Sequence, residues 1–131
     1  MKNDLSVLIL EDDFRVAKHI RSVVEKGGFA VAGIATNRAE AMELSMTSNI
    51  GLVLADIGLP NNECGIDVVN NIRMIKPMSV IFLTAFASQS TIEKMMLAMP
   101  SAYLNKPFRE EELLTNIDIA MKNAHRQSIA A

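Results

Sequence analysis

The feature that most constrains the fold is a regular alternation of short apolar runs with longer segments of helical period. The runs are rich in β-branched and large aliphatic residues and lack in/out alternation, which is typical of strands buried on both faces. They cover residues 5–10, 29–35, 52–55, 80–83 and 102–104. The intervening segments place apolar residues on one helical face. Strand and helix repeated about five times predict an α/β fold with helices on both faces of a parallel sheet.

Local signals predict where some of the helices begin and end. Asn37 followed by Glu40 resembles a capping box, and Ser90 with Glu93 predicts another helix start. The last helix is expected to end near Lys122, which leaves residues 125–131 as a short disordered tail. The chain of 131 residues is long enough for one domain and too short for two ordinary ones.

Composition excludes several classes of function. The net charge of −2 argues against nonspecific nucleic-acid binding, which needs a basic face. The apolar runs are shorter than the roughly 20 residues that span a bilayer, and no secretory signal precedes them. The single cysteine, Cys64, excludes an intramolecular disulfide and suits a reducing compartment. We therefore expect a cytoplasmic domain that binds neither membranes nor nucleic acid directly.

Chemically active side chains gather where the predicted strands end. Sites in such sheets form at the carboxyl ends of the strands. The first strand ends in Glu11 and Asp12, the third in Asp56, the fourth in Thr84 and the fifth in Lys106. Several carboxylates, one hydroxyl and one ammonium are thus expected at one edge of the sheet.

A divalent cation would make this crowding of carboxylates tolerable. Converging anions repel and raise one another's pKa unless a cation neutralises them. Mg²⁺ typically binds one or two carboxylates, waters and a phosphoryl group. Lys106 and Thr84 would then hold the remaining phosphoryl oxygens, and Asp56 would be the nucleophile that forms an acyl phosphate.

Four motifs in this order carry a family resemblance: LILEDD, LVLADIGLP, VIFLTAF and AYLNKPF. Together they resemble the CheY-like receiver domain of bacterial two-component response regulators. The resemblance implies a flavodoxin-like fold, with a five-stranded parallel sheet of order 2-1-3-4-5, over residues 1–124. It also implies that Glu11, Asp12, Asp56 and the backbone carbonyl of Gly58 bind Mg²⁺.

The resemblance assigns roles to the other strand ends as well. Thr84 matches the switch hydroxyl, Lys106 the lysine that contacts the phosphoryl group, and Tyr103 the switch aromatic. Lys106–Pro107 matches a peptide bond that is cis in the family. Tyr103 also has an ordinary explanation as core filling.

The implied function is a phosphorylation-activated switch in a two-component system or phosphorelay. Asp56 would accept phosphate from a sensor histidine kinase or a histidine phosphotransfer protein. The domain would catalyse its own phosphorylation and dephosphorylation, but act mainly in signalling. Activation would shift the surface of the fourth helix, fifth strand and fifth helix toward a downstream protein or an output domain, with homodimerisation as a possible result. No room remains for an output domain, so we expect a stand-alone receiver or one cut from a longer protein.

Other interpretations compete with this one. The acidic run after the first strand also suits a helix cap, and Asp13 is expected to have that role. A receiver-like adaptor would bind partners without phosphate. A flavin or nucleotide binder needs a phosphate-cradling loop where this chain has three acids. A phosphatase of the haloacid dehalogenase type needs an acid at Gly58. The stretch DIGLPNNECG is also one residue longer than the family's commonest spacing.

Overall fold

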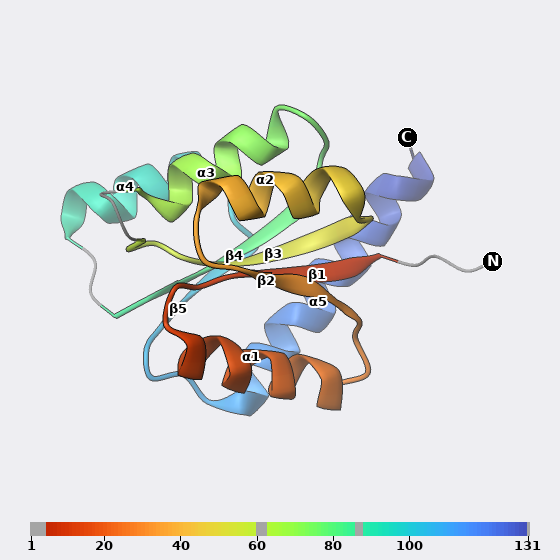
Figure 1. Cartoon of the computed structure of the whole chain (residues 1–131), viewed down its shortest axis with the longest axis horizontal. Coiled ribbons are helices and arrows are strands. Elements are labelled where there is room, and N and C mark those ends of the chain that lie inside the picture. The colour runs from red at the N-terminus through yellow and green to blue at the C-terminus, as the bar shows by residue number, and fades with distance from the viewer. Residues whose placement is uncertain (1–4, 60–62, 86–87, 131) are drawn as a thin grey trace.

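The computed structural model describes residues 5–59, 63–85 and 88–130. Within these ranges, strands and helices alternate along the whole chain (Figure 1). The strands are β1 (Ser6–Leu10), β2 (Val31–Ala35), β3 (Ile50–Asp56), β4 (Ser79–Thr84) and β5 (Ala102–Asn105). The helices are α1 (Phe14–Lys26), α2 (Arg38–Thr47), α3 (Gly65–Arg73), α4 (Gln89–Leu97) and α5 (Glu110–Ala130). The chain therefore forms the α/β alternation that its sequence predicts.

The five strands form one parallel sheet in the order β2-β1-β3-β4-β5. Helices α1 and α5 cover one face, and α2, α3 and α4 cover the other (Figure 1). This confirms the flavodoxin-like order expected from the family resemblance. The register pairs Leu10 with Ala55 and Thr84 with Asn105, which brings the carboxyl ends of the strands to one edge of the sheet.

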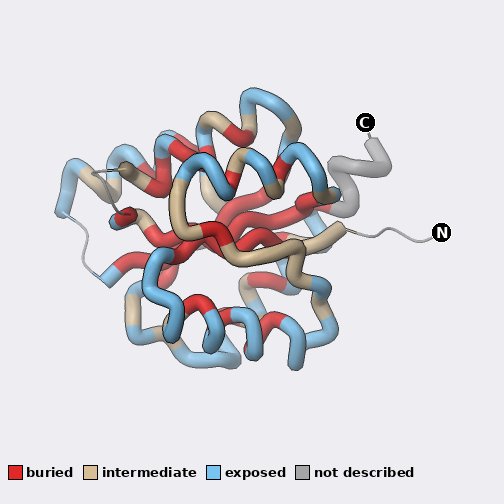
Figure 2. The backbone as a smooth tube through the Cα atoms, in the orientation of Figure 1, coloured by how far each residue is buried: buried red, intermediate tan, exposed pale blue. Residues whose placement is uncertain are grey.

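An apolar core lies on each side of the sheet, and the sheet is the most deeply buried part of the molecule (Figure 2). Alternate residues of β1 divide between the two cores: Leu8 and Leu10 face α2 and α3, whereas Val7 and Ile9 face α1 and α5. Every residue of β3 and β4 is buried. The edge strand β2 is mostly half-buried, and half of the residues of the edge strand β5 are exposed. The expectation of burial on both faces is therefore correct only for the interior strands.

Several helix ends differ from the sequence prediction. The cap at Asn37 is confirmed, since its side chain accepts a hydrogen bond from the Glu40 N–H. Helix α4 is capped by Ser88 rather than by Ser90, because the Ser88 hydroxyl reaches the Thr91 N–H at 3.2 Å. Helix α5 continues to Ala130, beyond the predicted end near Lys122.

The spacing of Met95, Met96 and Met99 along the sequence predicts one packing face, but in the structure these three side chains do not form one. Met95 is fully buried, but Met96 and Met99 are 55% and 79% exposed. Met99 follows the helix in the left-handed conformation, with φ of 52°. Among the helices of the described residues, none is long and apolar enough to cross a membrane.

Candidate functional site

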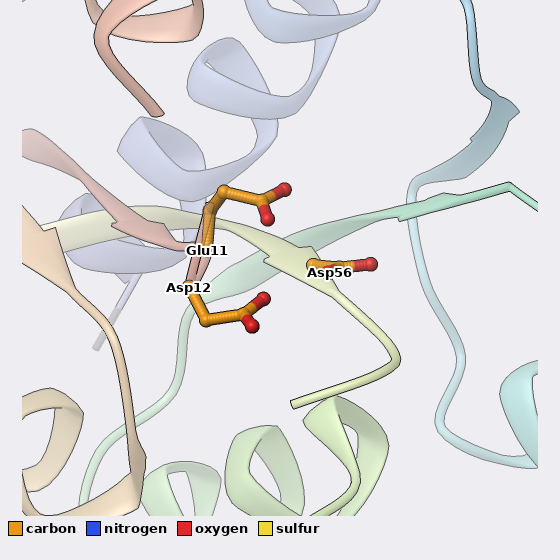
Figure 3. Close-up of side chains that lie close together, drawn as sticks. All are labelled: Glu11, Asp12 and Asp56. Atoms are coloured by element: carbon orange, nitrogen blue, oxygen red, sulfur yellow. The ribbon is translucent and has the colours of Figure 1, made fainter. Parts of the chain in front are cut away.

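The acidic residues of the site are placed by two adjacent strands. Glu11 and Asp12 follow the last residue of β1, and Asp56 is the last residue of β3. These strands pair directly, with Leu10 opposite Ala55. The three side chains consequently extend from the same edge of the sheet toward a common space (Figure 3).

The three carboxylates lie close enough to share one ion. Each offers an oxygen, and these oxygens all lie within 4.8 Å of one another. Glu11 is 2% exposed and Asp56 9%, whereas Asp12 is exposed at the surface. Glu11 Oε2 also accepts a hydrogen bond from the Asp13 N–H at 3.1 Å, which fixes the orientation of its carboxylate.

Asp13 has the structural role that the sequence suggested for it. Its carboxylate accepts hydrogen bonds from the N–H groups of Arg15 and Val16, so it caps helix α1. The first turn of α1 is thereby anchored directly beside Glu11 and Asp12. Asp13 is therefore a helix cap, and the acidic cluster consists of Glu11, Asp12 and Asp56.

Lys106 is the cation of the site. Its Nζ lies 2.8 Å from Glu11 Oε1 and 3.5 Å from Asp56 Oδ1. Burial favours the neutral amine, but hydrogen bonds and charge attraction from Glu11 and Asp56 outweigh burial and raise the pKa of Lys106. The ammonium is therefore held between two carboxylates that come from different strands.

Asp56 is the most perturbed acid of the site. Burial and the negative charge of Glu11 raise its pKa from 3.8 to about 6, although Lys106 acts in the opposite direction. The carboxylate is still mostly ionised at neutral pH, but it is a stronger base than an ordinary aspartate. A raised pKa at a strand end is typical of functional carboxylates.

The residues present fit a divalent cation. Carboxylate oxygens are the ligands that Mg²⁺ prefers. Three carboxylates beside one ammonium leave an excess negative charge that a divalent ion would balance. Gly58, from which a carbonyl ligand is expected, lies exposed just beyond the end of β3.

Thr84 and Tyr103 lie on neighbouring strands of the sheet. Thr84 is the last residue of β4, and it is buried with 3% of its surface exposed. Its carbonyl accepts a hydrogen bond from the Lys106 N–H at 2.8 Å. Tyr103 on the edge strand β5 is 38% exposed, so it is not core filling in this structure. The Lys106–Pro107 peptide bond is cis, as the family resemblance implied.

Two residues that matter for the site were missed by sequence reasoning. Gly65 begins α3, and a Cβ at this position would overlap the Asp56 carbonyl oxygen. Glu63 accepts a hydrogen bond from the Arg38 N–H at 2.9 Å, which ties the stretch after β3 to helix α2. A glycine at the start of a helix could have indicated the close contact of Gly65 with the Asp56 backbone, because such a contact leaves no space for a side chain. Nothing local in the sequence indicates the contact of Glu63 with the Arg38 N–H.

Comparisons with known proteins give a consistent result. The family model described as the response regulator receiver domain matches residues 7–118. The transcriptional regulatory protein PdtaR of Mycobacterium tuberculosis is 30% identical over 115 residues, which are 88% of this chain and 56% of that protein. A CheY-like receiver domain from Methanospirillum hungatei superposes with a TM-score of 0.87 at 25% identity, covering 95% of this chain and 99% of that one.

The chain is also similar to a solved structure with a different title. The anti-anti-sigma factor PhyR of Bartonella quintana superposes with a TM-score of 0.78 at 32% identity. The match covers 96% of this chain and 52% of that one. The chain spans about half the length of the curated relatives that it matches, such as PdtaR.

Proposed function

The chain belongs to the response regulator receiver domain family, and on this premise we propose that Asp56 accepts a phosphoryl group from a phosphohistidine. The donor would be a sensor histidine kinase or a histidine phosphotransfer protein. The observation that carries the proposal is the convergence of Glu11, Asp12, Asp56 and Lys106 at one edge of the sheet. The product is a signalling state of the domain.

The chemistry is a displacement at phosphorus. An Asp56 carboxylate oxygen attacks and a new O–P bond forms. The P–N bond of the phosphoimidazole, protonated on its other ring nitrogen, breaks, and neutral imidazole leaves with the electron pair of that bond. The pKa of about 6 supports this role, because the carboxylate is ionised at neutral pH and is more basic than an exposed aspartate. Charge stabilisation and positioning supply most of the rate enhancement in such reactions.

The other site residues have separate tasks. Glu11, Asp12, Asp56 and the Gly58 carbonyl would hold Mg²⁺, which supplies neutralisation of charge on the transferring group when bound. Lys106 already contacts Asp56 Oδ1 at 3.5 Å, so its ammonium is placed to hold a phosphoryl oxygen once Asp56 is modified.

Phosphorylation would then change the output surface through Thr84 and Tyr103. The Thr84 hydroxyl moves toward the phosphoryl oxygens, and Tyr103 turns from its half-exposed position into the space released. The surface formed by α4, β5 and α5 would be altered for a partner, and this is a population shift between two states. Support comes from the position of these two residues on adjacent strands that end at the site.

The partner that reads this surface is expected to be a protein. One structural relative is titled an anti-anti-sigma factor, and we take this title as support for a protein partner. The competing candidate is an adaptor that binds such a partner without phosphate. The raised pKa of Asp56 and the shared position of three carboxylates favour the phosphorylated switch, since an adaptor has no need for either.

The direct test is chemical phosphorylation of the isolated chain. Phosphoramidate or acetyl phosphate with Mg²⁺ should add one phosphoryl group, detected by mass spectrometry. Asp56→Asn should abolish the gain, whereas Asp118→Asn on the exposed face of α5 should not change it. A wild-type chain that stays unmodified with these donors and with candidate kinases would contradict the proposal and favour the adaptor.

The switch role of Thr84 has its own test. Thr84→Ala should leave phosphorylation of Asp56 largely intact while reducing the difference in partner binding between the phosphorylated and unmodified forms. Thr84→Ser, which keeps the hydroxyl, is the matched variant and should retain that difference. Equal loss of phosphorylation and of coupling in the alanine variant would contradict this assignment.

A further inference from the structure

We propose that Glu63 is a positioning residue for the Gly58 carbonyl, because it ties the segment that carries this carbonyl to the start of helix α2. The inference rests on the proposed function, in which that carbonyl is a ligand of Mg²⁺. Glu63 itself does not belong to the acidic cluster of Glu11, Asp12 and Asp56. Its effect on the metal would be transmitted through the backbone.

After β3, residues 57–59 pair in antiparallel fashion with residues 63–65, and these two paired stretches are called the hairpin below. The Gly65 N–H donates to the Ile57 carbonyl at 2.8 Å, and the Leu59 N–H donates to the Glu63 carbonyl at 3.2 Å. Between these bonds, Gly58 and Cys64 form an antiparallel bridge. The two sides of the hairpin, residues 57–59 and 63–65, therefore move together, and Gly58 lies in the middle of one side.

Gly58 is not held in place by side-chain packing. It is exposed, and among the described residues other than Gly58 itself and its two chain neighbours, no atom lies within 4 Å of the position where its Cβ would be. Glycine also has the widest choice of backbone conformations. The direction of its carbonyl must therefore be set by the hairpin and by whatever anchors the hairpin.

Several contacts fix this hairpin to the rest of the domain, including the Ile57 N–H, which donates to the Leu83 carbonyl at 3.3 Å. At its base, Gly65 packs directly against the Asp56 backbone. On the side of Gly58, Leu59 is 9% exposed and belongs to the core under α2 and α3. On the other side, Glu63 Oε1 accepts the Arg38 N–H at 2.9 Å. Glu63 thus anchors this side of the hairpin to the start of α2 by a polar contact.

The start of helix α2 is a favourable binding place for the Glu63 carboxylate. The first N–H groups of a helix have no partner within the helix, and its start attracts negative charge. Asn37 already caps the N–H of Glu40, and Glu63 takes that of Arg38. The Arg38 guanidinium in turn donates to Asn71 Oδ1 on α3, so the contact point of Glu63 is itself fixed between two helices.

The test compares Mg²⁺ affinity among variants at position 63. Glu63→Ala should weaken Mg²⁺ binding about tenfold, as measured by isothermal titration calorimetry. This is the lower end of the loss in metal affinity seen when a residue that orients a metal ligand is removed. Glu63→Gln, whose amide oxygen can still accept the Arg38 N–H, should keep most of the affinity. Glu43→Ala removes an equal charge from the exposed face of α2 and should bind like wild type.

A second readout needs no metal. Amide hydrogen exchange of the apo protein should be faster at Leu59 and Gly65 in Glu63→Ala, and close to wild type in Glu63→Gln. If the alanine variant fails to fold, Glu63→Asp replaces it, because the shorter side chain keeps the charge but loses reach. It should then show the same weaker binding and faster exchange.

The outcomes separate this inference from the proposed function. Wild-type affinity and wild-type exchange in Glu63→Ala, or in Glu63→Asp if that is used, would overturn the role of Glu63 and leave the phosphorylation of Asp56 standing. Weaker binding in Glu63→Gln equal to that in Glu63→Ala would also overturn it, because charge and not the anchor would then be responsible. Absence of Mg²⁺ binding by the wild-type chain would overturn both.

Discussion

Replacing Asp56 by asparagine is expected to stabilise the metal-free domain, although it removes the proposed phosphoryl acceptor. Ionised Asp56 is unfavourable in the fold because it is buried and lies beside Glu11. Asparagine has the same shape and no charge. The substitution therefore removes a charge that the folded state tolerates poorly and that the unfolded chain accepts without cost.

The size of the effect follows from the pKa of Asp56. Because the folded-state pKa of about 6 is higher than the ordinary value of 3.8, ionisation costs the folded protein about 3 kcal/mol at pH 7.5. The cost is absent well below pH 3.8, grows as pH rises and is complete above about pH 6. Asp56→Asn should therefore raise the free energy of unfolding by about 3 kcal/mol at pH 7.5 and by only about 1 kcal/mol near pH 4.5.

Urea unfolding followed by circular dichroism in the far ultraviolet measures this difference, and it suits a chain that has no tryptophan. The measurements are made with EDTA at both pH values. Asp118→Asn makes the same chemical change at an exposed ion pair with Lys122 and should stay within about 0.5 kcal/mol of wild type. Saturating Mg²⁺ should reduce the difference in the free energy of unfolding between Asp56→Asn and wild type at pH 7.5, because the ion stabilises the wild-type site more than that of the variant.

The reasoning would be refuted by an Asp56→Asn variant that is no more stable than wild type at pH 7.5 in EDTA. That result would mean that Lys106 compensates the charge of Asp56 fully. A gain of equal size at pH 4.5 and pH 7.5 would also contradict it, because the gain would then not come from ionisation.

Three further substitutions test other parts of the structure. Gly65→Ala should lower the free energy of unfolding by about 2 kcal/mol or more, since its Cβ would overlap the Asp56 carbonyl; thermal unfolding in EDTA measures the loss. Met99→Gly should raise it by about 0.5–1 kcal/mol, because φ of 52° suits glycine and the exposed methionine gives up little burial; an unchanged urea midpoint would contradict this. Lys94→Gln should cost less than about 1 kcal/mol, since its 3.0 Å ion pair with Asp67 is exposed, and the difference should shrink in high salt.

The sheet and the acidic cluster were predictable because they depend on patterns that are local in the sequence. The unbroken apolar runs of β3 and β4 indicate strands buried on both faces, and both are fully buried. Parallel strands bring their carboxyl ends to one edge, so Glu11, Asp12 and Asp56 were expected to meet before any distance was known. The strand order itself came from the family resemblance and not from periodicity.

The details that escaped prediction depend on contacts between distant segments or on choices between similar signals. Ser88 and Ser90 are both good helix caps, and only the backbone path decides that Ser88 is used. The contact of Glu63 with the start of α2 joins residues 25 apart, and no local pattern marks it. Likewise, the spacing of Met95, Met96 and Met99 predicts a buried face, but of these three only Met95 lies in the core.

Arg73 fixes one end of α4 from outside the helix. Its guanidinium, at the end of α3, donates hydrogen bonds to the carbonyls of Ala98 and Met99, just beyond the last turn of α4. Within α4 itself, Met95 is the only buried residue. Helix α4 is therefore held mainly near its carboxyl end. When Thr84 moves, the amino end of α4, which follows Thr84 in the chain, is expected to shift more than the carboxyl end.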